Sequence, residues 1–160
     1  CEISMAVYTK TYDLSKVKSI PEDTYQWCLR NNFESGRKAD LGHTSSCIKA
    51  WLVECVEEGK GLLIVAHNGQ RHLGWGLTYQ IEDYVPPKQE FQVYVPPRCR
   101  RRGIGSKILA KACAKVGRVE VFAHDTSDKF YIANGLTRAE AITGKRLKSH
   151  VGNKKKGRTR

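Results

Sequence analysis

The stretch VPPRCRRRGIGSKILAKAC, from Val95 to Cys113, is the part of the sequence that most constrains the fold. Four arginines lie within five residues, at positions 98, 100, 101 and 102, directly before two glycines at 103 and 105. Apolar residues then recur with helical spacing as far as Val116. Together with the apolar run EFQVYV over Glu90–Val95, this pattern predicts a strand, a basic glycine-containing turn and a helix over Gly105–Val116.

The predicted turn has the chemistry of an anion-binding site. The first amide N–H groups of a helix have no acceptor inside the helix, and the helix dipole adds partial positive charge at the same end. Glycines let successive N–H groups curl around a ligand, and arginines add charge and forked donors. The turn suits a phosphate or diphosphate, although GxxxxGK[ST] and a complete GxGxxG are both absent. The alternative is a solvated basic turn.

The residues before the stretch predict two helices and a hairpin. Ser19, followed by a proline and two acids, is typical of a helix start, and Ser45 or Ser46 opens a second helical pattern. Asn68-Gly69 separates two apolar runs and is a strong hairpin signal. The elements expected are a strand over residues 3–8, helices over about 19–32 and 46–58, and strands over 61–67 and 72–81.

The residues after the stretch predict a strand, a helix and a last strand. VEVFAH (119–124) is apolar enough for a buried strand with a parallel partner, and a helix is expected over 125–134, ended by Gly135. A weaker pattern predicts a last strand over 136–142. The expected order is β-α-α-β-β-β-α-β-α-β, which indicates an α/β protein with a mixed sheet, of the α+β kind, flanked by helices.

Length and charge predict one domain with a basic tail. The chain has 160 residues and a net charge of +12, and residues 144–160 contain eight basic side chains and no acid. We expect a domain over 1–143 and a tail over 144–160 that either contacts RNA or another polyanion or only keeps the chain dispersed. No apolar run is long enough for a bilayer, and the six cysteines form no CxxC pair. A cytoplasmic protein with reduced thiols, no metal and no membrane partner is therefore expected.

Two motifs resemble the GNAT superfamily of N-acetyltransferases. RRRGIG at 100–105 fits the motif R-x-x-G-x-G, with Val95 and Pro97 in register before it. FYIANGL at 130–136 resembles the lYeklGF signature that follows the next strand in this family. The resemblance covers roughly residues 60–137, and it implies a GNAT-like fold with acetyl-CoA as the acetyl donor.

The resemblance also implies roles for particular residues. The turn amides would hold the acetyl-CoA diphosphate, and the end of the preceding strand would contact the thioester oxygen. The cofactor-binding residues expected are Val93, Tyr94, Val95, Arg100, Arg101, Arg102, Gly103, Ile104, Gly105 and Ser106. Arg98 and Lys107 would approach either the 3′-phosphate or only the solvent.

The expected catalytic residues are Tyr131 and Glu90. Tyr131 stands four residues before Gly135, where many family members have a tyrosine that protonates the departing thiolate. Glu90 lies close to the position at which some family members carry a general base. The alternative is that Glu90 is only a solvent-exposed charge at the edge of a strand. His67, His72 and His124 are further candidates for the base, with the first two expected at exposed hairpin positions.

The acceptor is left open by the sequence. His124 and Asp125 stand where family members often have an asparagine that bonds the cofactor, so this contact is expected to differ. A protein lysine, a protein N-terminus and a small amine all fit as acceptors. The alternative functions are a toxin-like acetyltransferase acting on aminoacyl-tRNA, and a non-catalytic nucleic-acid-binding module on the same fold.

Overall fold

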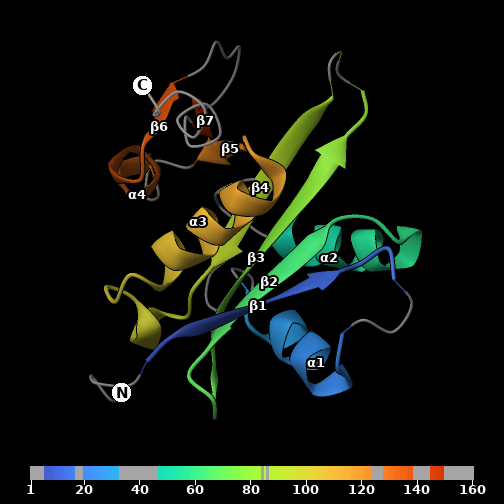
Figure 1. Cartoon of the computed structure of the whole chain (residues 1–160), viewed down its shortest axis with the longest axis vertical. Helices are drawn as coiled ribbons and strands as arrows, with labels where there is room; N and C mark the ends of the chain where they lie inside the picture. The colour runs from blue at the N-terminus through green and yellow to red at the C-terminus, as the bar shows by residue number, and fades with distance from the viewer. Residues whose placement is uncertain are drawn as a thin grey trace.

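A computed structural model describes residues 6–16, 20–32, 47–83, 85, 87–123, 128–138 and 145–149. The elements are arranged along one mixed sheet with helices on both faces (Figure 1). They are β1 (Tyr8–Asp13), α1 (Glu22–Arg30), α2 (Cys47–Glu58), β2 (Leu62–His67), β3 (His72–Ile81), β4 (Lys88–Tyr94), the short 3-10 helix η3 (Pro97–Cys99), α3 (Ile104–Val116), β5 (Glu120–Ala123), α4 (Asp128–Ala133), β6 (Leu136–Arg138) and β7 (Lys145–Ser149).

Within the described residues, the sheet has seven strands in the order β1-β2-β3-β4-β5-β7-β6. Every neighbouring pair is antiparallel except β4 and β5, which are parallel. The parallel pair is where α3 connects the two halves of the sheet, as a crossover between parallel strands requires. This confirms the predicted mixed sheet and the predicted parallel partner of the strand after α3.

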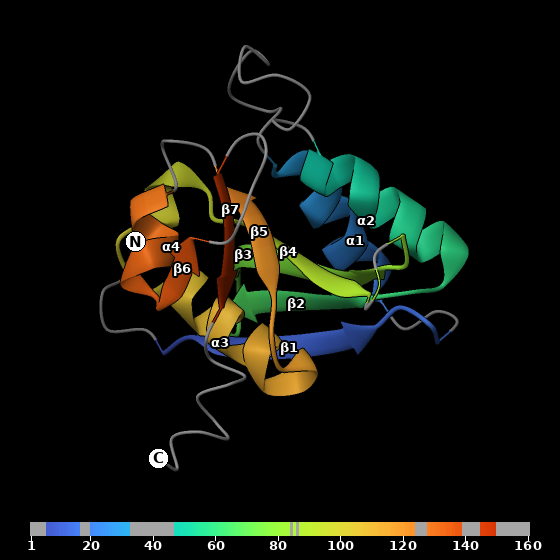
Figure 2. The same cartoon turned by 90° about the horizontal axis from the view of Figure 1, so that it is seen from above.

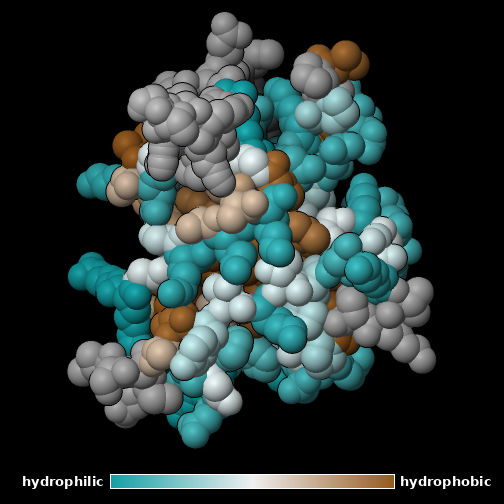
Figure 3. Space-filling view, in the orientation of Figure 1, coloured by the Kyte–Doolittle hydropathy of each residue, from teal (hydrophilic) through white to brown (hydrophobic). Residues whose placement is uncertain are grey.

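The helices divide between the two faces of the sheet (Figure 2). Residues of α1 and α2, such as Cys28, Ile48 and Leu52, form one buried cluster with Trp75 and Leu77 of β3. Residues of α3 and α4 form a second buried cluster on the opposite face, which includes Ile104, Ile108, Leu109, Phe91 and Tyr131. Figure 3 looks onto the α3 face, and hydrophilic side chains cover its centre.

Two glycines of β3 let α3 lie close against the sheet. A Cβ at Gly76 would come within 2.5 Å of Cγ2 of Ile108, and one at Gly74 would come within 3.1 Å of Cγ2 of Ile104. Both isoleucines are on the buried side of α3. The start of α3, which carries the basic turn, is therefore fixed to the middle of the sheet by close packing.

The structure corrects the predicted elements at both ends of the chain. The first strand is Tyr8–Asp13, later than the predicted 3–8, of which residues 3–5 lie outside the described part. The strand predicted over 136–142 is described only as Leu136–Arg138. Lys145–Ser149, expected in the tail, forms β7 between β5 and β6, so these five residues belong to the sheet. The first two predicted helices and the β2–β3 hairpin are confirmed. Helix α1 begins at Glu22, directly after Pro21.

Candidate functional site

The candidate site lies where β4 and β5 separate. The two strands share one described pair, Glu90 with Glu120, and no further pairing between them is present among the described residues. Val93 and Tyr94 end β4 beyond this point, and Val95 leads into the basic turn. An opening between parallel strands, at their carboxyl ends, is a common place for a ligand in α/β sheets. Val93, Tyr94 and Val95, which are predicted to contact the cofactor, lie at this end of β4 or directly after it.

The basic turn is a compact structure made by the backbone. Pro97–Cys99 forms the 3-10 turn η3, in which the Cys99 amide donates to the Pro96 carbonyl at 2.8 Å. Gly103 then takes a left-handed conformation with φ of 78° at the N-cap of α3. Arg101 also has a positive φ, 65°, which is uncommon for a residue with a side chain. Backbone strain of this kind is concentrated at functional sites.

The first amides of α3 have no hydrogen-bond acceptor inside the helix. The first hydrogen bond of the helix is donated by the Lys107 amide to the Gly103 carbonyl, at 3.0 Å. The amides of Ile104, Gly105 and Ser106 therefore have no acceptor within the helix itself. Arg101, Arg102 and Gly103 are exposed beside them, and no side-chain cap is described at this end. The result is a set of amide donors beside strong positive charge, which fits a diphosphate.

Arg100 has a role that the motif did not predict. Its Nε donates to the Val95 carbonyl at 2.7 Å, and its guanidinium lies 5.7 Å from the centre of the Tyr94 ring. The side chain therefore ties the turn back to the end of β4. Its outer guanidinium nitrogens stay on an exposed side chain and can still meet an anion. A sequence motif gives residue types but not the direction of a long side chain, so this contact had no signal in the sequence.

Tyr131 and Glu90 lie close to each other. Tyr131 is buried on α4, with 6% of its surface exposed, and its ring meets the Phe130 ring edge-on at 4.9 Å. Burial raises the pKa of the Tyr131 hydroxyl, and the negative charge of Glu90 raises this pKa further. Glu90 is only 3% exposed, so the alternative of a solvent-exposed charge at a strand edge is wrong. The two predicted catalytic groups thus come from β4 and α4 to one region of the interior.

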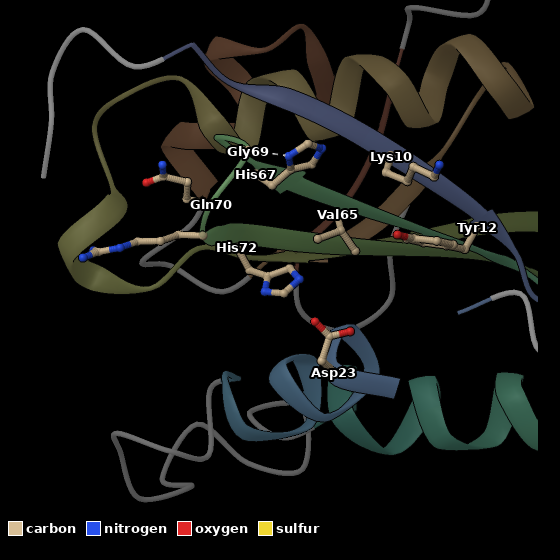
Figure 4. A pocket seen from close by; sticks show the side chains of 9 residues that line it. Lys10, Tyr12, Asp23, Val65, His67, Gly69, Gln70 and His72 are labelled. Atoms are coloured by element: carbon tan, nitrogen blue, oxygen red, sulfur yellow. Dashed lines mark hydrogen bonds between the residues drawn. The ribbon is translucent and has the colours of Figure 1, made fainter. Parts of the chain in front are cut away.

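A separate cavity of roughly 320 Å³ lies between β1, the β2–β3 hairpin and α1 (Figure 4). Asp23 points from α1 toward the sheet, and His72 points from β3 toward α1. The Thr24 hydroxyl lies 3.1 Å from Nε2 of His72, whose ring stacks on Trp27. Strand β3, which carries His72, is the neighbour of β4, and Trp75 of β3 pairs with Tyr94 at the end of β4. The cavity and the basic turn are nevertheless lined by different residues.

A β-bulge explains why His72 is not at an exposed hairpin position as expected. Ala66 pairs with Gly74 and His67 pairs with His72, which leaves Leu73 as an extra residue. The extra residue reverses the alternation of side chains at the end of β3 and turns His72 toward α1. His67 is half-buried, and its Nδ1 accepts from the Gly69 amide at 3.1 Å. His124 and Asp125 lie outside the described residues.

The described cysteines behave as small apolar side chains. Cys28, Cys55, Cys99 and Cys113 are buried thiols. Burial raises the pKa of the Cys55 thiol to about 11 and also raises that of Cys28, so neither is a reactive thiolate at neutral pH. The part of the chain that the structure describes contains no group of three or more metal-ligating side chains. None of its helices has the length and apolarity needed to cross a bilayer.

Comparison with solved structures shows the same fold in several acetyltransferases. A GCN5-related N-acetyltransferase from Ralstonia eutropha has 18% identity and a TM-score of 0.62, and the match covers 86% of this chain and 97% of that one. PaiA N-acetyltransferase from Thermoplasma acidophilum, solved with coenzyme A, has 15% identity and a TM-score of 0.59, with 91% and 99% covered. A ribosomal-protein-alanine N-acetyltransferase from Brucella melitensis has 15% identity and a TM-score of 0.60, with 81% and 96% covered.

Comparison at the level of sequence gives the family directly. No curated protein matches the chain significantly. The family model of the acetyltransferase (GNAT) family matches residues 21–135, which include both first helices, the basic turn, Glu90 and Tyr131. This match extends over more than half of the 160 residues. The chain is a member of the GNAT family of acetyltransferases.

Proposed function

We propose that the protein transfers the acetyl group of acetyl-CoA to a primary amine by direct attack within a ternary complex. The observation that carries this proposal is the basic turn at the start of α3, where exposed arginines stand beside amides that have no acceptor in the helix. The turn follows the end of β4, beyond the one described pair of β4 with β5. Family membership supports acetyl-CoA as the donor, and one protein of the same fold was solved with coenzyme A.

The donor is held in two places in this proposal. Amides of Gly103, Ile104, Gly105 and Ser106, with the arginines at 100, 101 and 102, bind the diphosphate. The pantetheine arm then runs along the open edge of β4. Main-chain groups of Val93 to Val95 form hydrogen bonds with it, as they would with an additional strand. An amide there also stabilises the negative charge that develops on the thioester oxygen during attack.

Glu90 and Tyr131 handle the protons. Glu90, through a water molecule, takes a proton from the acceptor ammonium, and the free amine attacks the thioester carbon. The new C–N bond forms, the C–S bond breaks, and the Tyr131 hydroxyl gives its proton to the sulfur. The nitrogen loses its second proton as the amide forms, and this proton returns through water to the Tyr131 oxygen. The raised pKa of Tyr131 keeps that proton in place at neutral pH until the thiolate appears. The nearby Glu90 carboxylate opposes the tyrosinate, so Tyr131 regains its proton readily.

The acceptor enters from the α1 and α2 face of the sheet in this proposal. Glu22 and Asp23 are exposed in the first turn of α1 and can attract a cation. Glu34 and Asp40, which the sequence also offers for this purpose, lie outside the described residues. A protein lysine, a protein N-terminus and a small amine remain the acceptor classes to be separated by experiment. A cytoplasmic location stays a prediction.

Labelled acetyl-CoA tests the proposal. The protein is incubated with acetyl-CoA that carries label on the acetyl group and with a cell extract, and the protein, RNA and small-molecule fractions are counted separately. We expect label in one fraction, and Tyr131→Phe should slow its appearance about 10- to 1,000-fold because thiolate departure loses its acid. The acetyl-CoA affinity of the variant should stay within a few-fold of the original. Absence of transfer to every fraction, from a protein that binds acetyl-CoA, would reject catalysis.

A further inference from the structure

The solvent face of α3 is a continuous basic surface. Residues 96–119 contain no acid and eight basic side chains, namely Arg98, Arg100, Arg101, Arg102, Lys107, Lys111, Lys115 and Arg118. Lys111 is half-buried and the other seven are exposed. We call Lys107, Lys111, Lys115 and Arg118 the α3 basic face. Its lysines stand four residues apart, which places them along one side of the helix.

Binding of a diphosphate accounts for only one end of this surface. The turn and Lys107 lie at the start of α3. Lys115 comes eight residues later, which is about 12 Å along a helix with a rise of about 1.5 Å per residue, and Arg118 follows it. A diphosphate bound to the amides of residues 103–106 does not reach Lys115 or Arg118. These distant charges therefore need a separate explanation.

The charge pattern of α3 is unfavourable for the isolated helix. Like charges four residues apart repel each other, and Lys107 in the first turn opposes the helix dipole. The other long helices are arranged differently: α1 has Glu22 and Asp23 in its first turn and Arg30 in its last. In α2, Glu54, Glu57 and Glu58 accompany a single lysine. A surface that only faces solvent usually carries both positive and negative side chains. Both kinds are present on α1 and α2, whereas α3 carries only positive ones.

We propose that the α3 basic face binds the phosphodiester backbone of a single nucleic-acid strand. Successive lysines rise by about 6 Å along the axis, which lets each meet a separate phosphate, and each contact releases counterions. An apolar protein partner fits less well, because the exposed large apolar residues in the described part of the chain are Tyr8, Val85 and Ile132, none of them on α3. With no aromatic side chain on this face to stack on bases, binding is independent of sequence.

The salt dependence of binding tests this directly. The full chain is titrated into a fluorescent 20-nucleotide RNA, and into DNA of the same sequence, at salt concentrations from about 50 to 300 mM. Lys111→Gln with Lys115→Gln should make the slope of log K against log salt shallower by about 1.4, which is about 0.7 for each lost phosphate contact. The matched control, Lys16→Gln with Arg30→Gln, changes net charge equally away from α3 and should leave the slope unchanged. Equal affinities and slopes for RNA and DNA would indicate that the protein recognises only the phosphodiester backbone. A higher affinity for RNA would indicate further contacts to the 2′-hydroxyl groups.

Folding and acetyl-CoA binding are measured on the same variants. The double glutamine variant removes repulsion in α3, so its melting temperature should not fall, and its acetyl-CoA affinity should not change. Equal slopes for this variant and its control would overturn the proposal, as would binding to phosphatidylserine vesicles without binding to nucleic acid. The inference does not depend on catalysis: a protein that transfers no acetyl group but shows the lysine-dependent slope would still support it.

Discussion

His72 is the residue whose contacts give the clearest consequence for stability. Its ring lies against Trp27, and Thr24 and Asp23 lie close to it from α1. Burial lowers the pKa of His72, Asp23 partly opposes this, and His67 adds to the lowering. The folded state therefore binds this proton less readily than the unfolded chain, whose histidine has the ordinary pKa of 6.5.

The free energy of unfolding should consequently fall as the pH drops below about 6.5, and should stop falling once His72 is protonated in the folded state as well. Urea unfolding of the original chain and of His72→Gln between pH 5 and 8 measures this. Glutamine keeps a polar group for Thr24 but does not titrate, so the difference between the two proteins should shrink as the pH falls. A difference that is constant across this range would contradict the assignment.

At the same scale, the residues of the site were predicted unequally well. RxxGxG located the amide turn, because backbone geometry there depends on glycine at 103 and 105. The proximity of Glu90 and Tyr131 had no signal of its own in the sequence, since it depends on where the fold places α4 relative to β4. His72 was expected in solvent, and no pattern in HLGWGLTYQI marks the bulge at Leu73 that turns it inward.

Among the elements, the contact of α3 with β3 fixes the position of the basic turn. Gly76→Ala places a methyl group against Ile108 and Phe91 in a packed interior. We expect a loss of roughly 1–3 kcal/mol in the free energy of unfolding, or a fall of several degrees in melting temperature. Ala114→Ser, on the exposed side of the same helix, should change stability by less than about 0.5 kcal/mol.

Differential scanning calorimetry of both variants is the measurement. Acetyl-CoA affinity should also fall for Gly76→Ala, because a displaced α3 carries the turn amides with it. An alanine variant with the original melting temperature would mean that α3 packs less closely on β3 than the structure has it.

The elements that were misplaced are those without an apolar pattern. YTKTYD, which forms β1 at a sheet edge, has two tyrosines among four polar residues, so its strand signal is weaker than that of the apolar residues before it. KRLKS, which forms β7, has one apolar residue among charges and becomes a strand only by pairing with β5 and β6. Tertiary pairing of this kind overrides local preference. The hairpin of β2 and β3 was predictable because Asn68-Gly69 specifies the turn locally.

At the scale of the whole molecule, the sheet holds together two buried clusters and opens between β4 and β5. One cluster fixes α3 and its amide turn, and the other fixes α1 and α2 on the opposite face. Donor and acceptor are therefore expected to reach the opening from different sides. The order of helices and strands was largely predictable from the spacing of apolar residues. The opening was not, because it depends on how far the pairing of β4 with β5 extends.

The central claim is that the turn amides bind the diphosphate of acetyl-CoA, and calorimetric titration of two variants at one position tests it. Asparagine and aspartate both tolerate the left-handed backbone of Gly103, where a Cβ would meet nothing within 4 Å, and they differ only in charge. A carboxylate about 5 Å from a phosphate charge costs roughly 3 kcal/mol at an effective dielectric constant of about 20. The account predicts that Gly103→Asp binds acetyl-CoA on the order of 100-fold more weakly than Gly103→Asn. Equal affinities for the two variants would contradict it.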